Sequence, residues 1–203
     1  MNRIAKTMID YILVLVGLLF FWPLLLLIAV WIYLDSPGPV VFKHMRIGKN
    51  GRPFPCYKFR TMCVDADLCL AMLLEKYPDA RNEWEKNYKL KNDPRITGSG
   101  AFLRKTSLDE LPQIFNVLRG EMSLVGPRPV TEKELVLYGE YLEDYLSVKP
   151  GITGMWQVNG RSNTTYAERV QMDSWYVHNW SLLLDLELLC KTFVVVLTHK
   201  GAY

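Results

Sequence analysis

The sequence contains few of the residues that form metal centres and disulfide frameworks. Its 203 residues include 4 cysteines, none in a C-x-x-C pair, and 3 scattered histidines. These numbers and spacings indicate neither a zinc site nor a disulfide scaffold, and they are typical of reduced cytosolic thiols. The net charge is also small, since 24 Lys and Arg residues against 21 Asp and Glu residues leave +3. So weak a positive charge does not indicate binding to nucleic acid.

Long hydrophobic runs are absent except for one near the start. Hydrophobic residues make up 50% of the sequence and the mean hydropathy is +0.03, which excludes a disordered chain and a many-pass membrane protein. The exception is residues 11–34, which carry no charge. As a straight helix this run would be about 36 Å long, enough to cross a hydrocarbon core of roughly 30 Å. A Pro/Gly turn at 35–39 stands where a signal peptide has its cleavage site, so we expect the segment to remain in the mature protein.

Two features predict that this apolar segment enters and leaves the membrane on the same side. Pro23 lies near its middle and disturbs the preceding helical turn, which leaves two arms of about 17 Å, each close to the depth of one leaflet. Basic residues flank both ends: Arg3, Lys6, Lys43, His44, Arg46, Lys49 and Arg52. The positive-inside bias therefore favours the cytoplasmic side for both flanks. We predict a kinked re-entrant helix, with a proline-kinked spanning helix as the alternative.

The rest of the sequence predicts an α+β fold that is predominantly helical, with a small antiparallel β element. Two β-prone runs at 40–42 and 54–59 flank the segment 48–51, which is typical of a hairpin connection. Helical patterns cover 66–91 with a break at Pro78, 103–118, 131–146, 166–180 and 182–197. We divide the chain into a membrane helix, 1–36, and a second region, 37–203. The apolar and aromatic residues of its last two helices fit either a core or interfacial helices at the lipid head groups.

The densest polar cluster is residues 104–113, which read Arg-Lys-Thr-Ser-Leu-Asp-Glu-Leu-Pro-Gln. Ser107 and Glu110 have the spacing of an N-terminal capping box, and Asp109 fits the first turn of the same helix. Pro112 fits that helix less well, because a proline at the fifth helical position interrupts the hydrogen bonding. Adjacent acids on a helix point about 100° apart. One carboxylate could therefore face a reacting phosphorus while the other holds a cation.

A carboxylate that attacks a diphosphate meets like charge, so this chemistry requires cations. Mg²⁺ bridging phosphate oxygens and arginines forked onto them serve this purpose in proteins. Lys58, Arg104 and Arg128 are available, although residues of these types are more often solvated surface charges. Arg128 is the best placed of the three, because Pro127 and Pro129 fix the backbone on both sides of it.

Six motifs of this chain resemble those of the bacterial monotopic phosphoglycosyl transferases. They are Tyr57–Met62, Lys91–Arg95, Arg104–Gln113, Gly126–Pro129, Lys149–Gly154 and Gln157–Arg161. The resemblance covers essentially the whole chain and is closest to the undecaprenyl-phosphate galactose or glucose phosphotransferases. It implies a short form that lacks the multi-span N-terminal region of larger members. One departure is Trp22 before Pro23, where several members have a serine.

The resemblance implies transfer of a hexose 1-phosphate from a UDP-sugar, galactose favoured and glucose next, to undecaprenyl phosphate with release of UMP. This is the first membrane step of exopolysaccharide or O-antigen synthesis, at the cytoplasmic face of the bacterial inner membrane. By motif position, Asp109 is the nucleophile that forms an aspartyl-phosphosugar intermediate, and Glu110 is the Mg²⁺ ligand. The resemblance gives substrate-binding roles to Lys58, Arg104, Arg128, Gln157, Arg161 and Asp185.

Two other functions are compatible with the same residues. The chain could be a non-catalytic membrane-anchored module whose basic loops bind anionic lipid or a glycan-assembly partner, although the intact acid pair disfavours this. It could also be a phosphatase that uses the same aspartate with water as the acceptor. The implied partners are a UDP-sugar, undecaprenyl phosphate and membrane lipid. The sequence leaves the oligomeric state open, and a homodimer is one of the states that it allows.

Overall fold

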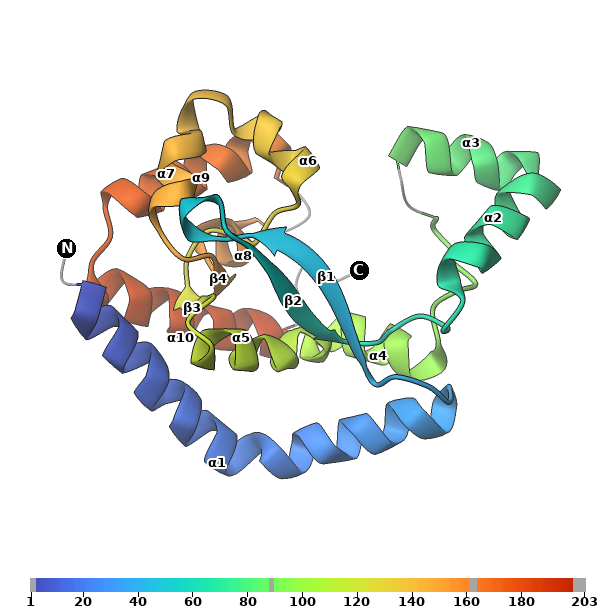
Figure 1. Ribbon diagram of the computed structural model, residues 1–203, viewed down its shortest axis with the longest axis horizontal. Helices are drawn as coiled ribbons and strands as arrows, with labels where there is room; N and C mark the ends of the chain where they lie inside the picture. The colour runs from blue at the N-terminus through green and yellow to red at the C-terminus, as the bar shows by residue number, and fades with distance from the viewer. Residues whose placement is uncertain (1–2, 88–89, 161–163, 199–203) are drawn as a thin grey trace.

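The computed structural model describes residues 3–87, 90–160 and 164–198 and is mostly helical, with two small sheets (Figure 1). The longer helices are α1 (Arg3–Asp35), α2 (Ala66–Lys76), α3 (Pro78–Asn87), α4 (Gly98–Thr106), α9 (Tyr166–His178) and α10 (Leu182–Thr198). The short helices are η1 (Lys49–Gly51), η2 (Leu108–Gln113), α5 (Ile114–Leu118), α6 (Glu132–Leu135), η3 (Val136–Tyr141), α7 (Leu142–Ser147) and α8 (Met155–Asn159). The strands are β1 (Val41–Ile47), β2 (Pro53–Phe59), β3 (Ser123–Val125) and β4 (Gly151–Thr153).

α1 is one helix with Pro23 inside it. It bends near its middle, and both of its ends turn toward the rest of the chain (Figure 1). Within the described ranges, it is the one helix long and apolar enough to cross a membrane, by length and composition. Only 11% of its most apolar 18-residue window is buried, whereas the core helix of a soluble protein is mostly buried. The apolar run of the sequence is therefore a largely exposed helix.

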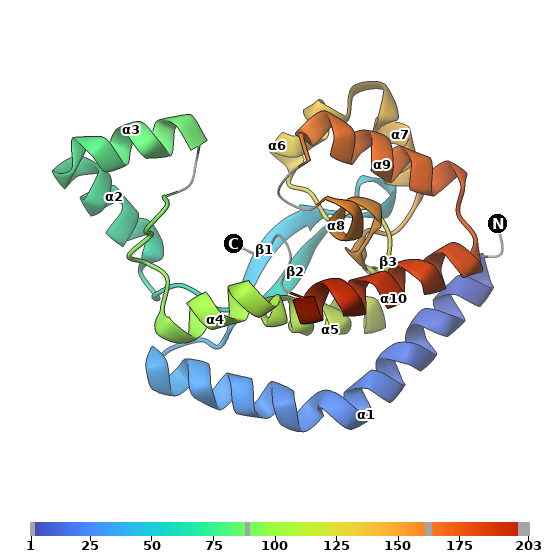
Figure 2. The ribbon, with the colours of Figure 1, turned by 180° about the vertical axis from the view of Figure 1, so that it is seen from behind.

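Both ends of α1 are attached to the body, by which we mean the described residues of 40–62 and 95–198. Near the start of α1, the buried Asp10 accepts a hydrogen bond from Ser123 Oγ at 2.7 Å through its Oδ2. At the other end, Asp35 Oδ2 accepts hydrogen bonds from the backbone N–H of Ser99 at 2.9 Å and from Ser99 Oγ at 2.8 Å. The middle of α1, around Pro23, lies between these two attachment points, and α10 and α5 run on the side of the body that faces it (Figure 2).

The β1–β2 hairpin confirms the predicted antiparallel element. Val41 lies opposite Phe59 and Ile47 opposite Pro53, with the predicted connection at 48–51 folded as η1. β1 continues to Ile47, beyond the predicted run at 40–42, because each of its residues pairs with one of β2. The strand pairing therefore extends over polar residues that local β-propensity does not favour.

Residues 103–118 do not form the single helix that their pattern predicts. α4 ends at Thr106, Ser107 takes the left-handed conformation with φ 59°, and η2 and α5 follow. The predicted capping box of Ser107 and Glu110 is wrong, because the Ser107 side chain caps no backbone N–H of η2. Pro112 lies inside a 3-10 helix, so it does not interrupt an α-helical ladder.

Two other helical predictions have opposite outcomes. The predicted single helix at 131–146 is wrong: the segment forms α6, η3 and α7, and Gly139, with a positive φ of 50°, breaks the helical backbone inside η3. The predicted break at Pro78 is confirmed, since Tyr77 is extended between α2 and α3. These two helices pack on each other and form an arm that projects from the body (Figure 1).

A parallel pair of strands, β3 and β4, was not predicted from the sequence. Ser123 pairs with Gly151 and Val125 with Thr153. The two backbones approach so closely beyond β3 that a Cβ on Gly151 would lie 2.1 Å from the backbone nitrogen of Gly126. This contact fixes the segment after β3, which carries Arg128.

Candidate active site

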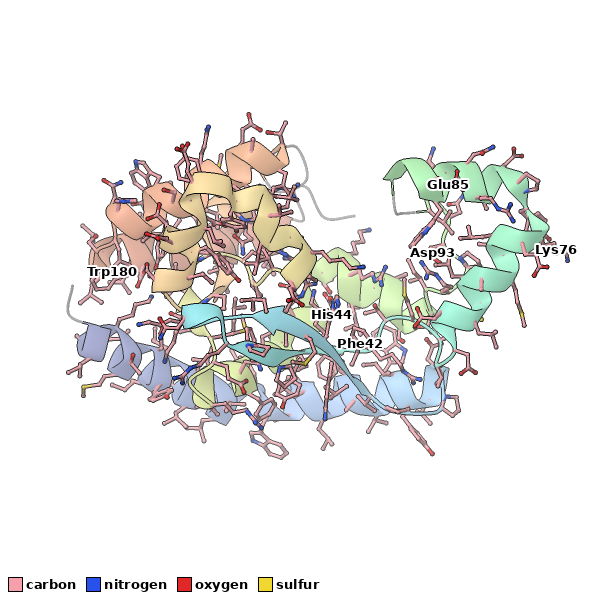
Figure 3. The ribbon with its side chains drawn as sticks, turned by 45° about the horizontal axis from the view of Figure 1, so that its top comes forward. Phe42, His44, Lys76, Glu85, Asp93 and Trp180 are labelled. Atoms are coloured by element: carbon pink, nitrogen blue, oxygen red, sulfur yellow. The ribbon has the colours of Figure 1, made fainter. Side chains whose placement is uncertain are left out.

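One face of the β1–β2 hairpin supplies the first wall of the site. Phe42 lies opposite Lys58 and His44 opposite Cys56, and all four line one cavity. Side chains alternate along a strand, so Arg46, two residues beyond His44, lines the same cavity. Phe42 and His44 lie on β1 near the centre of the molecule (Figure 3). The hairpin therefore brings aromatic and basic side chains to one cavity.

η2 supplies the two adjacent acids. A 3-10 helix has about 3.0 residues per turn, so Leu108 and Leu111 lie in one row, and both pack against the buried cluster that includes Ile32 of α1. Asp109 and Glu110, on the remaining positions, line the cavity. Their side chains are only 13% and 21% exposed, respectively. The pattern Leu-Asp-Glu-Leu thus anchors η2 against α1 and turns both carboxyl groups to the cavity.

Cations surround this acid pair. Lys58 Nζ donates a hydrogen bond to Glu110 Oε1 at 2.6 Å and lies 3.8 Å from Asp109 Oδ2, while Arg128 donates to Glu110 Oε1 at 3.5 Å. Burial disfavours the charged form of Glu110, but Lys58 and Arg128 outweigh it and lower the pKa of Glu110 to about 2. Burial raises the pKa of Asp109, Lys58 opposes that rise, and the Glu110 charge adds to it. The two neighbouring carboxyl groups therefore differ in basicity, with Asp109 the more basic.

Arg128 comes from the segment between β3 and α6. Its guanidinium lies 5.7 Å from the ring centroid of Trp156, and Arg169 of α9 lies 4.5 Å from the same ring. All three residues line the cavity. Stacking on an aromatic face holds a guanidinium in place while its N–H groups stay available to oxygen ligands.

Arg104 reaches the site from α4. Its Nε donates to Thr61 Oγ1 at 2.9 Å, and both residues line the cavity. α4 approaches Thr61 so closely that a Cβ on Gly100 would lie 2.1 Å from the Thr61 carbonyl oxygen. Because glycine permits this approach, Arg104 lies on the same cavity as the acids of η2.

The cavity that these groups share has a volume of about 870 Å³, which lies within the range of ligand sites in enzymes. Val195 and Val196 of α10 and Ile152 of β4 add apolar surface to its wall. It is therefore a large cavity with a pair of carboxyl groups and several cations on its wall.

Three other residues have a predicted role in substrate binding, and they do not lie together in the structure. Gln157 of α8 lines the cavity, and Arg161 lies outside the described residues. Asp185 is not among the lining residues. It is buried in a network in which Lys6 Nζ lies 2.6 Å from its Oδ2, and Tyr176 Oη donates to its Oδ1 at 2.6 Å. The structure therefore joins Asp185 to the start of α1 and not to the acids of η2.

Sequence reasoning missed several lining residues, among them His44, Arg46, Arg60, Trp156 and Arg169. Arg46 is held by Glu134, with Nη1 donating to Oε2 at 3.0 Å. The alternation of Phe42, His44 and Arg46 along a strand is a signal that could have indicated the first two of these missed residues. No local pattern connects Arg169, on a helix late in the chain, to the hairpin.

Glu110 fits a magnesium ion that takes few of its ligands from the protein. Across the described ranges, no group of three or more His, Cys, Asp or Glu side chains could hold a metal ion by itself. Mg²⁺ often binds only one or two carboxylates, with substrate phosphates and water completing its octahedron. Both hydrogen bonds to Glu110 fall on Oε1, and no described residue donates to Oε2. An ionised carboxylate with one oxygen available suits such an ion.

Comparison with known proteins identifies related sequences. The profile of a family described as "Bacterial sugar transferase" matches residues 1–199. The chain is 54% identical over 202 residues to an "Uncharacterized sugar transferase" of Haemophilus influenzae, covering 100% of this chain and 43% of that protein. It is 50% identical over 202 residues to the "Undecaprenyl-phosphate galactose phosphotransferase" of Salmonella typhimurium, covering 100% of this chain and 42% of that protein.

A shorter relative matches over most of its own length. The "Exopolysaccharide production protein ExoY" of Rhizobium meliloti is 49% identical over 199 residues, covering 98% of this chain and 88% of that protein. The chain thus spans less than half the length of the two longer relatives and most of the length of ExoY.

Proposed function

This chain belongs to the bacterial sugar transferase family, and from that premise we propose that it transfers a hexose 1-phosphate from a UDP-sugar to undecaprenyl phosphate, releasing UMP. The observation that carries this proposal is the Asp109 carboxyl group, whose pKa burial raises, on a large cavity with Lys58, Arg104 and Arg128. A basic carboxylate among cations suits attack on a phosphorus atom that carries negative charge. Galactose is the favoured sugar, because the Salmonella relative is named for it, and glucose is next.

The proposed reaction has two displacements at the sugar-linked phosphorus. In the first, an Asp109 carboxylate oxygen forms a bond to that phosphorus, and the bond to the bridging diphosphate oxygen breaks, so that UMP leaves with the electron pair. In the second, a phosphate oxygen of undecaprenyl phosphate attacks the same phosphorus and frees Asp109. The product is an undecaprenyl diphosphate sugar, which starts an exopolysaccharide or O-antigen unit.

The basic residues have separate tasks in this proposal. Lys58 contacts both acids, so it keeps Glu110 ionised and lowers the cost of charge on Asp109. Arg128 and Arg104 bind phosphate oxygens from two sides of the cavity. Glu110 would hold Mg²⁺, which would supply charge neutralisation for the diphosphate when bound.

We also propose that α1 is a re-entrant membrane helix and that the body lies on the cytoplasmic face of the bacterial inner membrane. The ion pair of Lys6 with Asp185 and the Asp10–Ser123 hydrogen bond attach the start of α1 to the body. Asp35 attaches its end to the same body. A helix that crossed the bilayer would separate its two ends by the thickness of the membrane, and it could not keep both sets of contacts.

The experiment that tests the activity is UMP release from a panel of UDP-sugars, with and without undecaprenyl phosphate. The proposal predicts a stoichiometric burst of UMP without the lipid and continuous turnover with it, fastest for UDP-galactose. Free sugar phosphate in place of a lipid-linked product would support the phosphatase alternative. No UMP from any UDP-sugar in the presence of lipid and Mg²⁺ would contradict the transferase.

A further inference from the structure

His44 lies on the wall of the 870 Å³ cavity with one edge of its ring held by a neighbour. Its Nδ1 lies 3.2 Å from Arg46 Nη2, and both residues line the cavity. Because a guanidinium only donates hydrogen bonds, Nδ1 is the acceptor in this contact. Among the residues that the structure describes, none forms a hydrogen bond with Nε2 of this ring. The Nε2 edge of His44 is therefore available to a ligand.

Arg46 is itself held in place by Glu134. Its Nη1 donates to Glu134 Oε2 at 3.0 Å, and the same oxygen accepts from the backbone N–H and from Oγ1 of Thr131, each at 2.7 Å. Thr131 and Glu134 form the capping box at the start of α6. Three donors on one carboxylate oxygen fix Glu134, so the Arg46 guanidinium keeps its second nitrogen on His44.

These contacts select one neutral form of the imidazole. Partial burial and the charge of Arg46 lower the pKa of His44, with Lys58 adding to that effect and Glu134 opposing it, so the ring is neutral near pH 7. A neutral imidazole carries one hydrogen, and because Nδ1 accepts, that hydrogen is on Nε2. His44 therefore presents a hydrogen-bond donor to the cavity, and it cannot become an acceptor there without losing its contact with Arg46.

The β1–β2 hairpin runs from α1 toward α7. At one end, Val40, the residue before β1, packs against the buried cluster that includes Ile32 of α1. At the other end, Tyr145 Oη of α7 donates to the Ile47 carbonyl at 2.6 Å. Figure 1 shows the same course of the two strands. Positions along β1 therefore measure the distance from α1.

His44 lies farther from α1 than the cations at the acid pair. It is four residues beyond Val40, about 13 Å along the strand at roughly 3.3 Å per residue. Lys58, which contacts both acids, lies opposite Phe42, between Val40 and His44. The order along the hairpin is therefore α1, the acid pair with Lys58, and then His44.

This order indicates which part of the substrate meets His44, an inference that rests on the proposed function. The undecaprenyl chain of the acceptor stays in the membrane, on the side of α1. The nucleoside of the donor is polar, and placing it in lipid would be costly, so it extends from the diphosphate toward the other end of the hairpin. The base at the end of that nucleoside lies near His44.

We propose that His44 recognises the base of the donor nucleotide, with its Nε2–H donating to O4 of uracil and with Arg46 as the residue that positions the ring. Uracil has an acceptor at this position, whereas cytosine has an amino group that donates. With cytosine, two donors would face each other, and Arg46 keeps the ring from switching to the form that accepts. The site thus selects uracil and also rejects cytosine.

The test measures the dissociation constants of UMP and CMP for the full chain in a non-ionic detergent, by isothermal titration calorimetry. The two nucleotides differ only in the base and carry no sugar donor, so the readout needs no turnover. Wild-type protein should bind UMP about tenfold more tightly than CMP, because CMP loses a hydrogen bond and sets a donor against Nε2–H. Equal binding of both would overturn this proposal alone, and binding of neither would contradict the proposed function as well.

Matched variants assign the preference to the ring. His44→Phe keeps a ring but removes the donor, so UMP should bind about tenfold more weakly and the preference for UMP should disappear. Arg46→Met removes the donor that keeps Nδ1 an acceptor, so CMP binding should improve relative to UMP. Lys43→Gln, one residue from His44 and not on the cavity, is the control and should keep the wild-type preference.

The His44→Phe result separates the base from the phosphate as the group that His44 contacts. If His44 bound a phosphate oxygen, this variant would weaken UMP and CMP equally and leave the preference unchanged, which would overturn the proposal. An unchanged preference in Arg46→Met would overturn the positioning role of Arg46. In both cases UMP still binds to the wild type, so the proposed transferase activity stands.

Discussion

Lys58 donates to Glu110 across 52 residues of sequence, with 2.6 Å between Nζ and Oε1. This contact joins β2 to η2. Together with Arg128 it lowers the pKa of Glu110, so that Glu110 is ionised without a bound ligand. It also leaves Asp109 as the more basic of the two neighbouring carboxyl groups. Glu110 receives the direct hydrogen bonds of the cations, whereas burial dominates the pKa of Asp109 and raises it.

The first prediction separates the nucleophile from its neighbour. Asp109→Asn keeps the side-chain volume but loses the charge and basicity needed to displace UMP, so turnover should fall by orders of magnitude while folding is retained. Wild-type protein incubated with UDP-sugar alone should show a sugar-phosphate adduct by intact mass, and Asp109→Asn should show none. Near-normal lipid-linked product from this variant would contradict the covalent mechanism.

The second prediction concerns the pH dependence of that adduct. Asp109 must be ionised to attack, and its pKa is raised, so adduct formation should fall as the pH drops through that raised value. Glu110, with a pKa of about 2, stays ionised throughout a working pH range. The Arg104 charge lowers the pKa of Asp109, so Arg104→Gln should move the acid limb to higher pH.

Arg104→Lys is the matched control for this shift, because it retains the charge and should leave the acid limb near its wild-type position. The measurement is the initial rate of adduct formation, by rapid quench and intact mass, across the acid range. An acid limb at the same pH in wild type and Arg104→Gln would show that Asp109 does not set it.

The third prediction concerns the cation. EDTA should abolish UMP release, and Mg²⁺ or Mn²⁺ should restore it, because the diphosphate must be neutralised before a carboxylate approaches. Glu110→Gln should raise the Mg²⁺ concentration needed for half-maximal activity. Full activity in metal-free buffer would remove Glu110 from its proposed role.

The fourth prediction concerns the topology of α1. Single cysteines at positions 3 and 50, in a chain whose four native cysteines are replaced, should both react from the cytoplasmic side. The reason is that Lys6 and Asp35, at opposite ends of α1, bind the same body. Labelling intact spheroplasts with a membrane-impermeant maleimide measures this, and reaction of one position alone from outside would show that α1 spans the bilayer.

The fifth prediction concerns Asn116, which ties α5 to β2. Its Oδ1 accepts from the backbone N–H of Tyr57, its Nδ2 donates to the Pro55 carbonyl and to Glu121, and it is fully buried. Asn116→Ala leaves these groups unpaired and should cost about 1 to 3 kcal/mol of unfolding free energy. The midpoint should fall by about 2 to 4 °C for each kcal/mol. The exposed Asn92→Ala is the control and should change the midpoint little.

The amino-acid sequence by itself determined the apolar helix with Pro23, the antiparallel hairpin, and the acid and basic motifs that place this chain in its family. These features depend on neighbouring residues: an uncharged run long enough for a bilayer, a turn between β-prone segments, and short ordered motifs. Local pattern was sufficient for them.

Only the tertiary structure decided what those residues contact. Ser107 and Glu110 have the spacing of a capping box, but Ser107 is left-handed and caps no backbone N–H of η2. Glu110 instead accepts a hydrogen bond from Lys58 of β2, which lies 52 residues away in the sequence. Asp185 pairs with Lys6 at the other end of the chain, 179 residues away. Such pairs depend on long-range packing, whose energy does not appear in any local window of sequence.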